Sequence, residues 1–154
     1  MADIIVGENT IHYEQAGAGP NLILLPTLLA EMSVYDGVIN ELSLHFRVTR
    51  MNFPGFGSST GPIDQNIEAY ADLISAAIKE LSLPPDTHLI GNGFGGFVAG
   101  TIAIYHGTII NKLVLVDTGA AFPYAAKEPL RILANKAKSE GMGSVLDLAI
   151  KRMF

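Results

Sequence analysis

The 154-residue sequence contains no cysteine, which excludes a disulfide scaffold, a thiolate nucleophile and a cysteine-bound zinc site. Charged residues are sparse, at 16% of the chain, and no block of Lys or Arg occurs. Because the net charge is also −5, charge-driven binding to nucleic acid is excluded. Hydrophobic residues make up 49% of the chain, so it can fill a buried core and does not have a disordered composition.

We also expect neither a membrane span nor a secretory signal. The 25 residues between Asp86 and Lys112 carry no formal charge, but they include six glycines and begin as a short apolar run that meets a glycine turn. A spanning helix needs about 20 mostly apolar residues, so a strand followed by a buried helix explains this stretch better. The first residues show no secretory signal, and we expect a cytoplasmic protein without a membrane partner.

Short aliphatic runs alternate with segments in which apolar residues recur every three or four positions. The runs predict strands and the periodic segments predict helices. The expected strands are residues 3–6, 10–15, 22–25, 47–51, 88–90 and 112–117, and the expected helices are residues 34–46, 67–81, 94–106, 127–140 and 143–154. This alternation predicts an α/β fold with a mostly parallel sheet and helices on both faces.

The sign of the charge changes along the chain. Residues 1–126 carry 12 acidic and 4 basic residues, whereas residues 127–154 carry 6 basic and 3 acidic ones. We interpret the first segment as the α/β core and the second as a helical lid. The last helix has an apolar stripe that we expect to be uncovered, which favours self-association through the lid helices, and its members are Val145, Leu148, Ala149 and Met153.

A glycine turn at residues 91–96 admits two interpretations. Read as Gly91-x-Gly93-x-x-Gly96, it is a dinucleotide fingerprint between a strand and a helix, and Asp117 lies 21 residues further on as a candidate ribose ligand. This interpretation predicts binding of NAD or FAD. However, the fingerprint normally opens its domain, and here about ninety residues of α/β structure precede it.

In the second interpretation, Gly91-Asn92-Gly93-Phe94-Gly95 is a nucleophile elbow, G-x-S-x-G, in which Gly93 replaces the serine. The elbow forces its central residue into a strained backbone conformation and needs small residues two positions to either side. Gly91 and Gly95 meet that requirement. A glycine at 93 relieves the strain, but it removes the hydroxyl that would attack a substrate.

Several ordered segments resemble the α/β-hydrolase family, and the resemblance covers essentially residues 11–154. They are IHYEQAGAGPNLILLP for two early strands, RMNFPGFGSST for the turn D-x-P-G-x-G-x-S with Asn52 in place of Asp, YADLISAAIKELSL for the helix before the elbow, HLIGNGFGGFVA for the elbow and KLVLVDTGAAFP for the strand before the lid. The closing GMGSVLDLAIKRMF is similar to the start of the lid in members like 3-oxoadipate enol-lactonase. Because several segments agree, we favour the hydrolase fold over the dinucleotide fold.

The resemblance implies acyl transfer by a serine, a histidine and an acid, and two backbone N–H groups that hold the oxyanion. The serine is absent at Gly93, and in this family the acid and the histidine follow the lid. The implied oxyanion donors are the N–H groups of Phe94 and Leu28, although the preceding loop has Pro26-Thr27 where the family has His-Gly. Core packing is an equally good interpretation of Leu28.

No other catalytic group replaces the missing ones. His12, His45, His88 and His106 fall in strands or at helix ends, where we expect structural roles. Asp117 ends a strand, where we expect a polar or capping role. No phosphate loop, HExxH motif, EF-hand loop or ligand-spaced histidine pair occurs, so we expect no metal and no cofactor.

Three functions remain open from the sequence. The first is a protein of ester or lactone hydrolase ancestry whose present chain is catalytically incomplete and inactive, with a small ester or lactone as its ligand. The second is a non-catalytic ligand-binding or self-associating module. The third is a nucleotide-binding protein that uses the glycine fingerprint.

Overall fold

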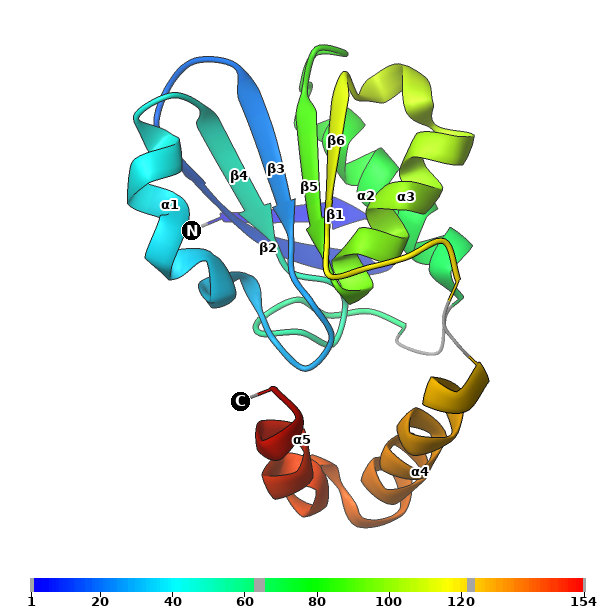
Figure 1. Cartoon of the computed structure of the whole chain (residues 1–154). Helices are drawn as coiled ribbons and strands as arrows, with labels where there is room; N and C mark the ends of the chain where they lie inside the picture. Colours follow the sequence, from blue (N-terminus) through cyan, green and yellow to red (C-terminus); the bar gives the residue numbers. More distant parts are fainter. Residues whose placement is uncertain (1, 63–65, 122–123, 154) are drawn as a thin grey trace. The chain divides into compact units, whose positions relative to one another are not determined.

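The computed structural model describes residues 2–62, 66–121 and 124–153, and it divides into two compact units, Met1–Gly119 and Ala120–Phe154 (Figure 1). The described residues of unit 1 form a six-stranded sheet, three α-helices and two short 3₁₀ helices. Its strands are β1 (Ala2–Val6), β2 (Asn9–Ala16), β3 (Asn21–Leu25), β4 (Arg47–Met51), β5 (His88–Asn92) and β6 (Lys112–Val116). Its helices are η1 (Met32–Tyr35), α1 (Asp36–Ser43), α2 (Ile67–Glu80), α3 (Phe94–Tyr105) and η2 (Gly107–Ile109).

The strand order in the sheet is β1-β2-β4-β3-β5-β6. β2 pairs antiparallel with β1 and β4, whereas β3, β4, β5 and β6 run parallel. In Figure 1, α1 lies on one face of the sheet and α2 and α3 lie on the other. The predicted α/β class, with a mostly parallel sheet and helices on both faces, is therefore confirmed.

Each face of the sheet has its own hydrophobic core. On the face of α2 and α3, the buried residues include Ile23, Leu25, Ile74, Leu89 and Val98. On the face of α1, Leu22, Leu24, Tyr35 and Val48 are buried together, with Ile39, Leu42 and Phe46 packed against them. Alternate residues of β3 supply the two cores because successive side chains of a strand point to opposite faces.

Local signals set the ends of the helices. α2 begins after Asn66, whose side chain accepts a hydrogen bond from the Ala69 N–H at 2.8 Å. It ends before Pro84 and Pro85, which cannot continue a helix. The segment predicted as one helix over 34–46 is instead split into η1 and the shorter α1. At the sheet edge, β6 leaves Val114, Leu115 and Val116 between 44% and 49% exposed.

Unit 2 consists of α4 (Tyr124–Glu140), η3 (Met142–Val145) and α5 (Leu146–Met153), and η3 packs against both helices. The charge step at residue 127 lies inside α4, and the assignment of this segment to a lid stays a prediction. In the predicted apolar stripe, Val145 and Ala149 are buried and Leu148 is 54% exposed. Residue 154 and the side chain of Met153, in the predicted helix 143–154, and residues 122 and 123, in the quoted segment KLVLVDTGAAFP, lie outside the described part of the chain.

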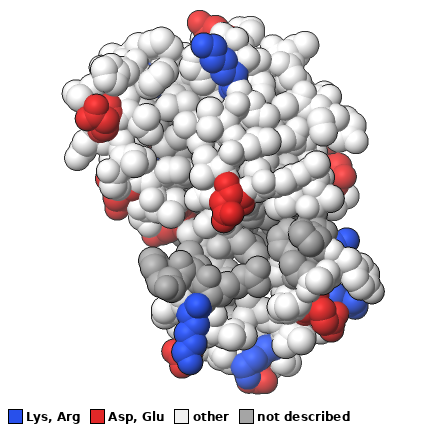
Figure 2. Space-filling view, viewed as in Figure 1, with Lys and Arg blue, Asp and Glu red and all other residues white. Residues whose placement is uncertain are grey.

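Charged side chains are scattered thinly over the face shown in Figure 2, and the Lys and Arg in view lie mainly over α4 and α5. No helix in the described part of the chain has both the length and the apolar character that a membrane crossing requires.

Candidate functional site

The candidate site lies at the carboxyl ends of β3 and β5. β3 sits between β4, which follows it in the sequence, and β5, which lies on its other side. The chain therefore leaves neighbouring parallel strands in opposite directions, which is the position where ligands bind in open α/β sheets. The segments that meet there are residues 26–30, residues 52–59 and the turn at Gly93.

Gly93 forms a sharp turn between β5 and α3. Its backbone angles are φ 52° and ψ −113°, a conformation that side-chain-bearing residues rarely adopt. A methyl group at Gly91 would lie 2.6 Å from the Gly95 carbonyl carbon, and one at Gly95 would lie 2.6 Å from the Pro26 carbonyl oxygen. The strand-to-helix turn and its small neighbours thus have the geometry of a nucleophile elbow, without a nucleophilic side chain.

The loop after β3 packs directly on the N-terminus of α3. The Gly95 N–H donates to the Pro26 carbonyl at 3.0 Å, and the Ala30 N–H donates to the Thr27 carbonyl at 3.4 Å. Leu29 adopts φ 63°, which is strained for a bulky residue. The side chain of Leu28 is 39% exposed and belongs to neither core, so core packing does not explain it.

The backbone amides predicted as oxyanion donors lie on these two adjoining segments. Among the described residues, neither the Leu28 nor the Phe94 N–H donates to a backbone carbonyl. Phe94 is the first residue of α3, where helical N–H groups have no partner inside the helix. Both N–H groups are therefore available to an acceptor from outside the chain.

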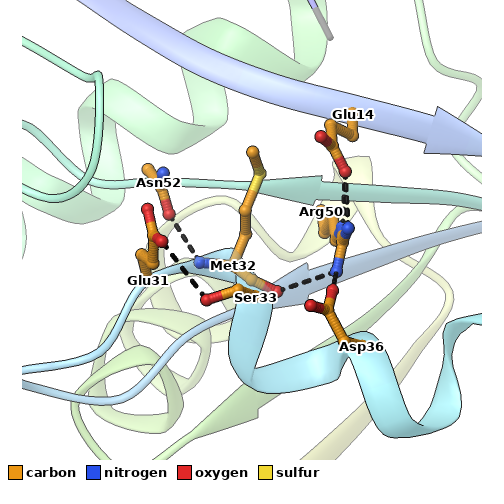
Figure 3. Close-up of polar contacts among 7 residues, drawn as sticks. All are labelled: Glu14, Glu31, Met32, Ser33, Asp36, Arg50 and Asn52. Atoms are coloured by element: carbon orange, nitrogen blue, oxygen red, sulfur yellow. Dashed lines mark hydrogen bonds and ion pairs between the residues drawn. The ribbon is translucent and has the colours of Figure 1, made fainter.

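Two polar side chains of the β4 region hold the backbone that follows this loop (Figure 3). The buried Asn52 accepts a hydrogen bond from the Met32 N–H at 2.7 Å, and Arg50 Nη1 donates to the Met32 carbonyl at 3.2 Å. Arg50 also pairs with Glu14 at 2.6 Å and with Asp36. The loop of residues 26–30 therefore lies between two fixed points. One is the end of β3, and the other is Met32, whose N–H and carbonyl are both hydrogen-bonded to side chains of the β4 region.

The charge of Arg50 is kept by its partners. Burial of the guanidinium by itself lowers its pKa, but hydrogen bonds and the negative charges of Asp36 and Glu14 raise it, and the resulting pKa lies above the ordinary value. Arg50 therefore stays charged in the physiological pH range.

Tyr35 fixes the start of the same loop. Its hydroxyl donates to the carbonyl of Leu25, the last residue of β3, at 2.7 Å. Because the ring is only 9% exposed, burial raises the pKa of Tyr35 to about 12. The phenol stays neutral and keeps its hydrogen bond in the physiological range.

An aromatic cluster lies beside the elbow. Phe53 is fully buried, and the rings of Phe56, Tyr70 and Phe94 contact it edge-on, at centroid distances between 5.0 and 5.7 Å. The half-buried rings of Phe56 and Phe94 stack at 6.1 Å with an interplanar angle of 10°. The turn of residues 52–59 thereby places an apolar surface next to the predicted oxyanion donors.

The histidines lie away from the elbow. His12 pairs with Asp3 at 2.7 Å, and His106 pairs with Asp72 at 2.6 Å. His88 begins β5, at the opposite end of that strand from Gly93, and its ring contacts Phe46 edge-on at 6.2 Å. His45 lies 4.0 Å from Glu41 on the surface.

Asp117 lies nearer the elbow than any histidine does. It follows β6, is exposed and adopts φ 48°, and the carbonyl of the preceding Val116 accepts the Gly93 N–H at 2.9 Å. His12 is the one described histidine at this end of the sheet, where its carbonyl accepts the Asn52 N–H at 3.0 Å, but its ring is paired with Asp3 on β1. In the described part of the chain, no group of three or more potential metal ligands occurs.

The glycines of the fingerprint are occupied by the protein's own packing. A methyl group at Gly96 would lie 2.6 Å from the Thr118 side chain, and one at Gly93 would overlap the Thr27 hydroxyl. These glycines therefore allow elements of the fold to approach each other, which accounts for their spacing without a dinucleotide.

Sequence reasoning missed the two features that fix the loop. The spacing that predicts a helix over 34–46 puts Tyr35 on the apolar face of that helix, and its hydrogen bond to Leu25 has no sequence signature. The anchoring pair Arg50 and Asn52 also escaped notice. A signal was present for Asn52, since it replaces the usual Asp of the turn, and for Thr27, since it replaces the glycine of His-Gly.

Comparison with known proteins agrees with this geometry. A family model described as alpha/beta hydrolase fold matches residues 20–137. Among curated proteins, pimeloyl-[acyl-carrier protein] methyl ester esterase of Nitrosomonas europaea is 32% identical over 124 residues, which cover 78% of this chain and 46% of the relative. The same-named esterase of Aeromonas hydrophila is 30% identical over 115 residues, which cover 73% and 43%. The chain thus spans less than half the length of these relatives.

Solved structures give the same result. The enol-lactonase of Burkholderia xenovorans superposes with a TM-score of 0.90 at 26% identity, over 98% of this chain and 59% of that one. A thermophilic esterase of Thermogutta terrifontis superposes with a TM-score of 0.85 at 30% identity, over 95% and 54%. With the elbow turn, the strand order and a family match over most of its length, this chain belongs to the alpha/beta hydrolase fold family.

Proposed function

We propose that this chain binds a small carboxylic ester or lactone at the carboxyl ends of β3 and β5 and does not cleave it by serine acyl transfer. The observation that carries the proposal is the elbow at Gly93, which keeps the backbone conformation of a nucleophile turn and has no side chain. The binding part of the site and the reacting part are separable, because a pocket and its oxyanion donors can outlast the nucleophile.

Backbone donors suit the carbonyl group of such a ligand. With a serine at 93, the hydroxyl would attack the carbonyl carbon, and the N–H groups of Leu28 and Phe94 would hold the oxygen as negative charge developed on it. Without the hydroxyl, the same two N–H groups would still donate hydrogen bonds to the carbonyl oxygen of a bound ligand. The ligand remains intact because Gly93 has no side chain with which to form the acyl bond.

The class of ligand follows from the relatives and from the surface beside the elbow. The curated relatives are methyl ester esterases, and one structural neighbour is an enol-lactonase. The stacked rings of Phe56 and Phe94 offer an apolar surface for the remainder of such a molecule. The chain spans less than half the length of the curated esterases, so the proposal concerns this chain and not the activity of a longer protein.

A titration of the ¹⁵N-labelled 154-residue chain with methyl butyrate tests the proposal. We expect the amide resonances of Leu28 and Phe94 to shift downfield with saturation, while the amide of the exposed Leu44, outside the site, does not move. Methanol release, followed in the same samples, should equal that of buffer. Saturable shifts elsewhere, no shifts at all, or methanol release above that of buffer would contradict the proposal.

A further inference from the structure

The side chain of Thr27 fills the space that a nucleophile would occupy. A Cβ atom built on Gly93 would overlap Thr27 Oγ1, and it would lie 3.0 Å from Thr27 Cβ and 3.7 Å from Thr27 Cα. The hydroxyl of Thr27 therefore stands where the side chain of residue 93 would project. The two departures from the family pattern, Thr27 for glycine and Gly93 for serine, are sterically complementary.

The position of this hydroxyl is fixed by the loop around it. The carbonyl of Pro26 accepts a hydrogen bond from the Gly95 N–H. The ring of Pro26 also fixes the φ angle of the residue just before Thr27. The carbonyl of Thr27 accepts the Ala30 N–H. Because a β-branched side chain has few rotamers, the Thr27 hydroxyl is held in a narrow range of orientations.

The hydroxyl is also free to bind. Within the described part of the chain, no hydrogen bond joins Thr27 Oγ1 to another residue, and the side chain is half-buried. The N–H groups of Leu28, the next residue, and of Phe94, the residue after Gly93, have no backbone acceptor among the described residues. The hydroxyl at the position of the missing nucleophile and the two amides of the adjoining segments are thus donors without a described partner.

We infer that Thr27 is the side chain that recognises the ligand at the elbow, where its hydroxyl donates a hydrogen bond to an oxygen of the ester or lactone group. This inference rests on the proposed function and adds to it the residue that selects an oxygen acceptor. The hydroxyl acts as a donor and not as a nucleophile, since the one described histidine at this end of the sheet, His12, has its ring paired with Asp3, and no hydrogen bond among the described residues joins a histidine to Thr27. The bound ester group is therefore held without a covalent step.

Two substitutions at Thr27 separate the hydroxyl from the shape of the side chain. Thr27→Val keeps the volume and removes the donor, whereas Thr27→Ser keeps the donor. In the methyl butyrate titration we expect Thr27→Val to weaken binding about three- to tenfold, the effect of one lost hydrogen bond, and Thr27→Ser to stay within about twofold of the unsubstituted chain. Thr101→Val, which removes the hydroxyl that donates to the Phe97 carbonyl on α3 at 2.9 Å, serves as the matched control and should bind like the parent.

The outcomes distinguish the two proposals. If the parent chain binds methyl butyrate and Thr27→Val binds it equally well, the assignment of Thr27 is wrong and the proposed function stands. If Thr27→Val and Thr101→Val weaken binding alike, the effect is not specific to the elbow and the assignment is also wrong. If the parent chain shows no saturable shift at Leu28 and Phe94, the proposed function fails, and the ligand role of Thr27 fails with it.

Discussion

Restoring a serine at position 93 by a single substitution should destabilise the protein. A residue with a side chain at φ 52° costs about 1–2 kcal/mol in backbone strain. Overlap with the Thr27 hydroxyl adds roughly 1–3 kcal/mol, the usual cost of overpacking. Rotation of the threonine cannot remove this cost completely, because its Cβ atom is itself 3.0 Å from the new Cβ.

The two costs can be measured separately. Gly93→Ser should lower the free energy of unfolding by about 2–5 kcal/mol, or the melting temperature by roughly 5–15 °C for a chain of this size. Gly7→Ser introduces a side chain at φ 59° with nothing within 4 Å, so it reports the strain alone. Gly100→Ser, in α3 with nothing within 4 Å and no positive φ, should be close to neutral.

A double-mutant cycle isolates the overlap. In Thr27→Gly/Gly93→Ser the space is vacated, so the double substitution should be less destabilising than the sum of the single ones by at least about 1 kcal/mol. Urea unfolding followed by circular dichroism measures the parent, the two single substitutions and the double one, together with the two glycine controls. Additivity within about 0.5 kcal/mol, or a Gly93→Ser chain as stable as the parent, would refute the idea that Thr27 occupies the nucleophile's place.

Three further predictions concern the residues that position the loop. Tyr35 holds its proton more tightly in the folded chain than in the unfolded one, with a pKa of about 12 against 10.0, so its stabilisation is complete below pH 10 and is lost as the pH rises towards 12. Urea unfolding should show that the parent loses about 2 kcal/mol more than Tyr35→Phe between pH 9 and 11.5, and parallel pH profiles would disprove this. Arg50→Gln should lower the free energy of unfolding by about 2–4 kcal/mol, because Glu14 loses its partner and the Met32 carbonyl loses a donor. It should also shift the Leu28 amide resonance. An unchanged free energy of unfolding would contradict the role of Arg50 in holding the loop. Asn52→Asp buries a carboxyl group, and burial should raise its pKa. The urea midpoint of this variant should therefore equal that of the parent near pH 4 and be lower near pH 7, where the buried carboxylate is charged. Equal midpoints of variant and parent at both pH values would contradict this.

The elements of the fold could be predicted because their signals are local. The aliphatic run of β3 and the apolar spacing of α2 fixed both elements to within one residue. The segment 34–46 was less well predicted, since its first turn is η1, held by the Met32 backbone contacts to Asn52 and Arg50. Those contacts join residues about 20 positions apart, and apolar periodicity carries no information about them.

In the candidate site, too, the features with local signals could be predicted and those that depend on distant contacts could not. The elbow could be predicted from its glycines, because a turn with a positive φ and close backbone packing requires glycine at those positions. The place of Thr27 could not be found that way, since it depends on how the end of β3 meets the start of α3. What the sequence offered was a pair of unexplained departures at positions 27 and 93, and only the three-dimensional structure shows that they compensate for each other.

A crystal structure of the 154-residue chain with methyl butyrate bound tests the central claim most directly. We predict an intact ester whose carbonyl oxygen lies within hydrogen-bond distance of the Leu28 and Phe94 N–H groups, with an ester oxygen in reach of Thr27 Oγ1. An ester bound elsewhere on the chain, or a site that holds butyrate after release of methanol, would contradict it.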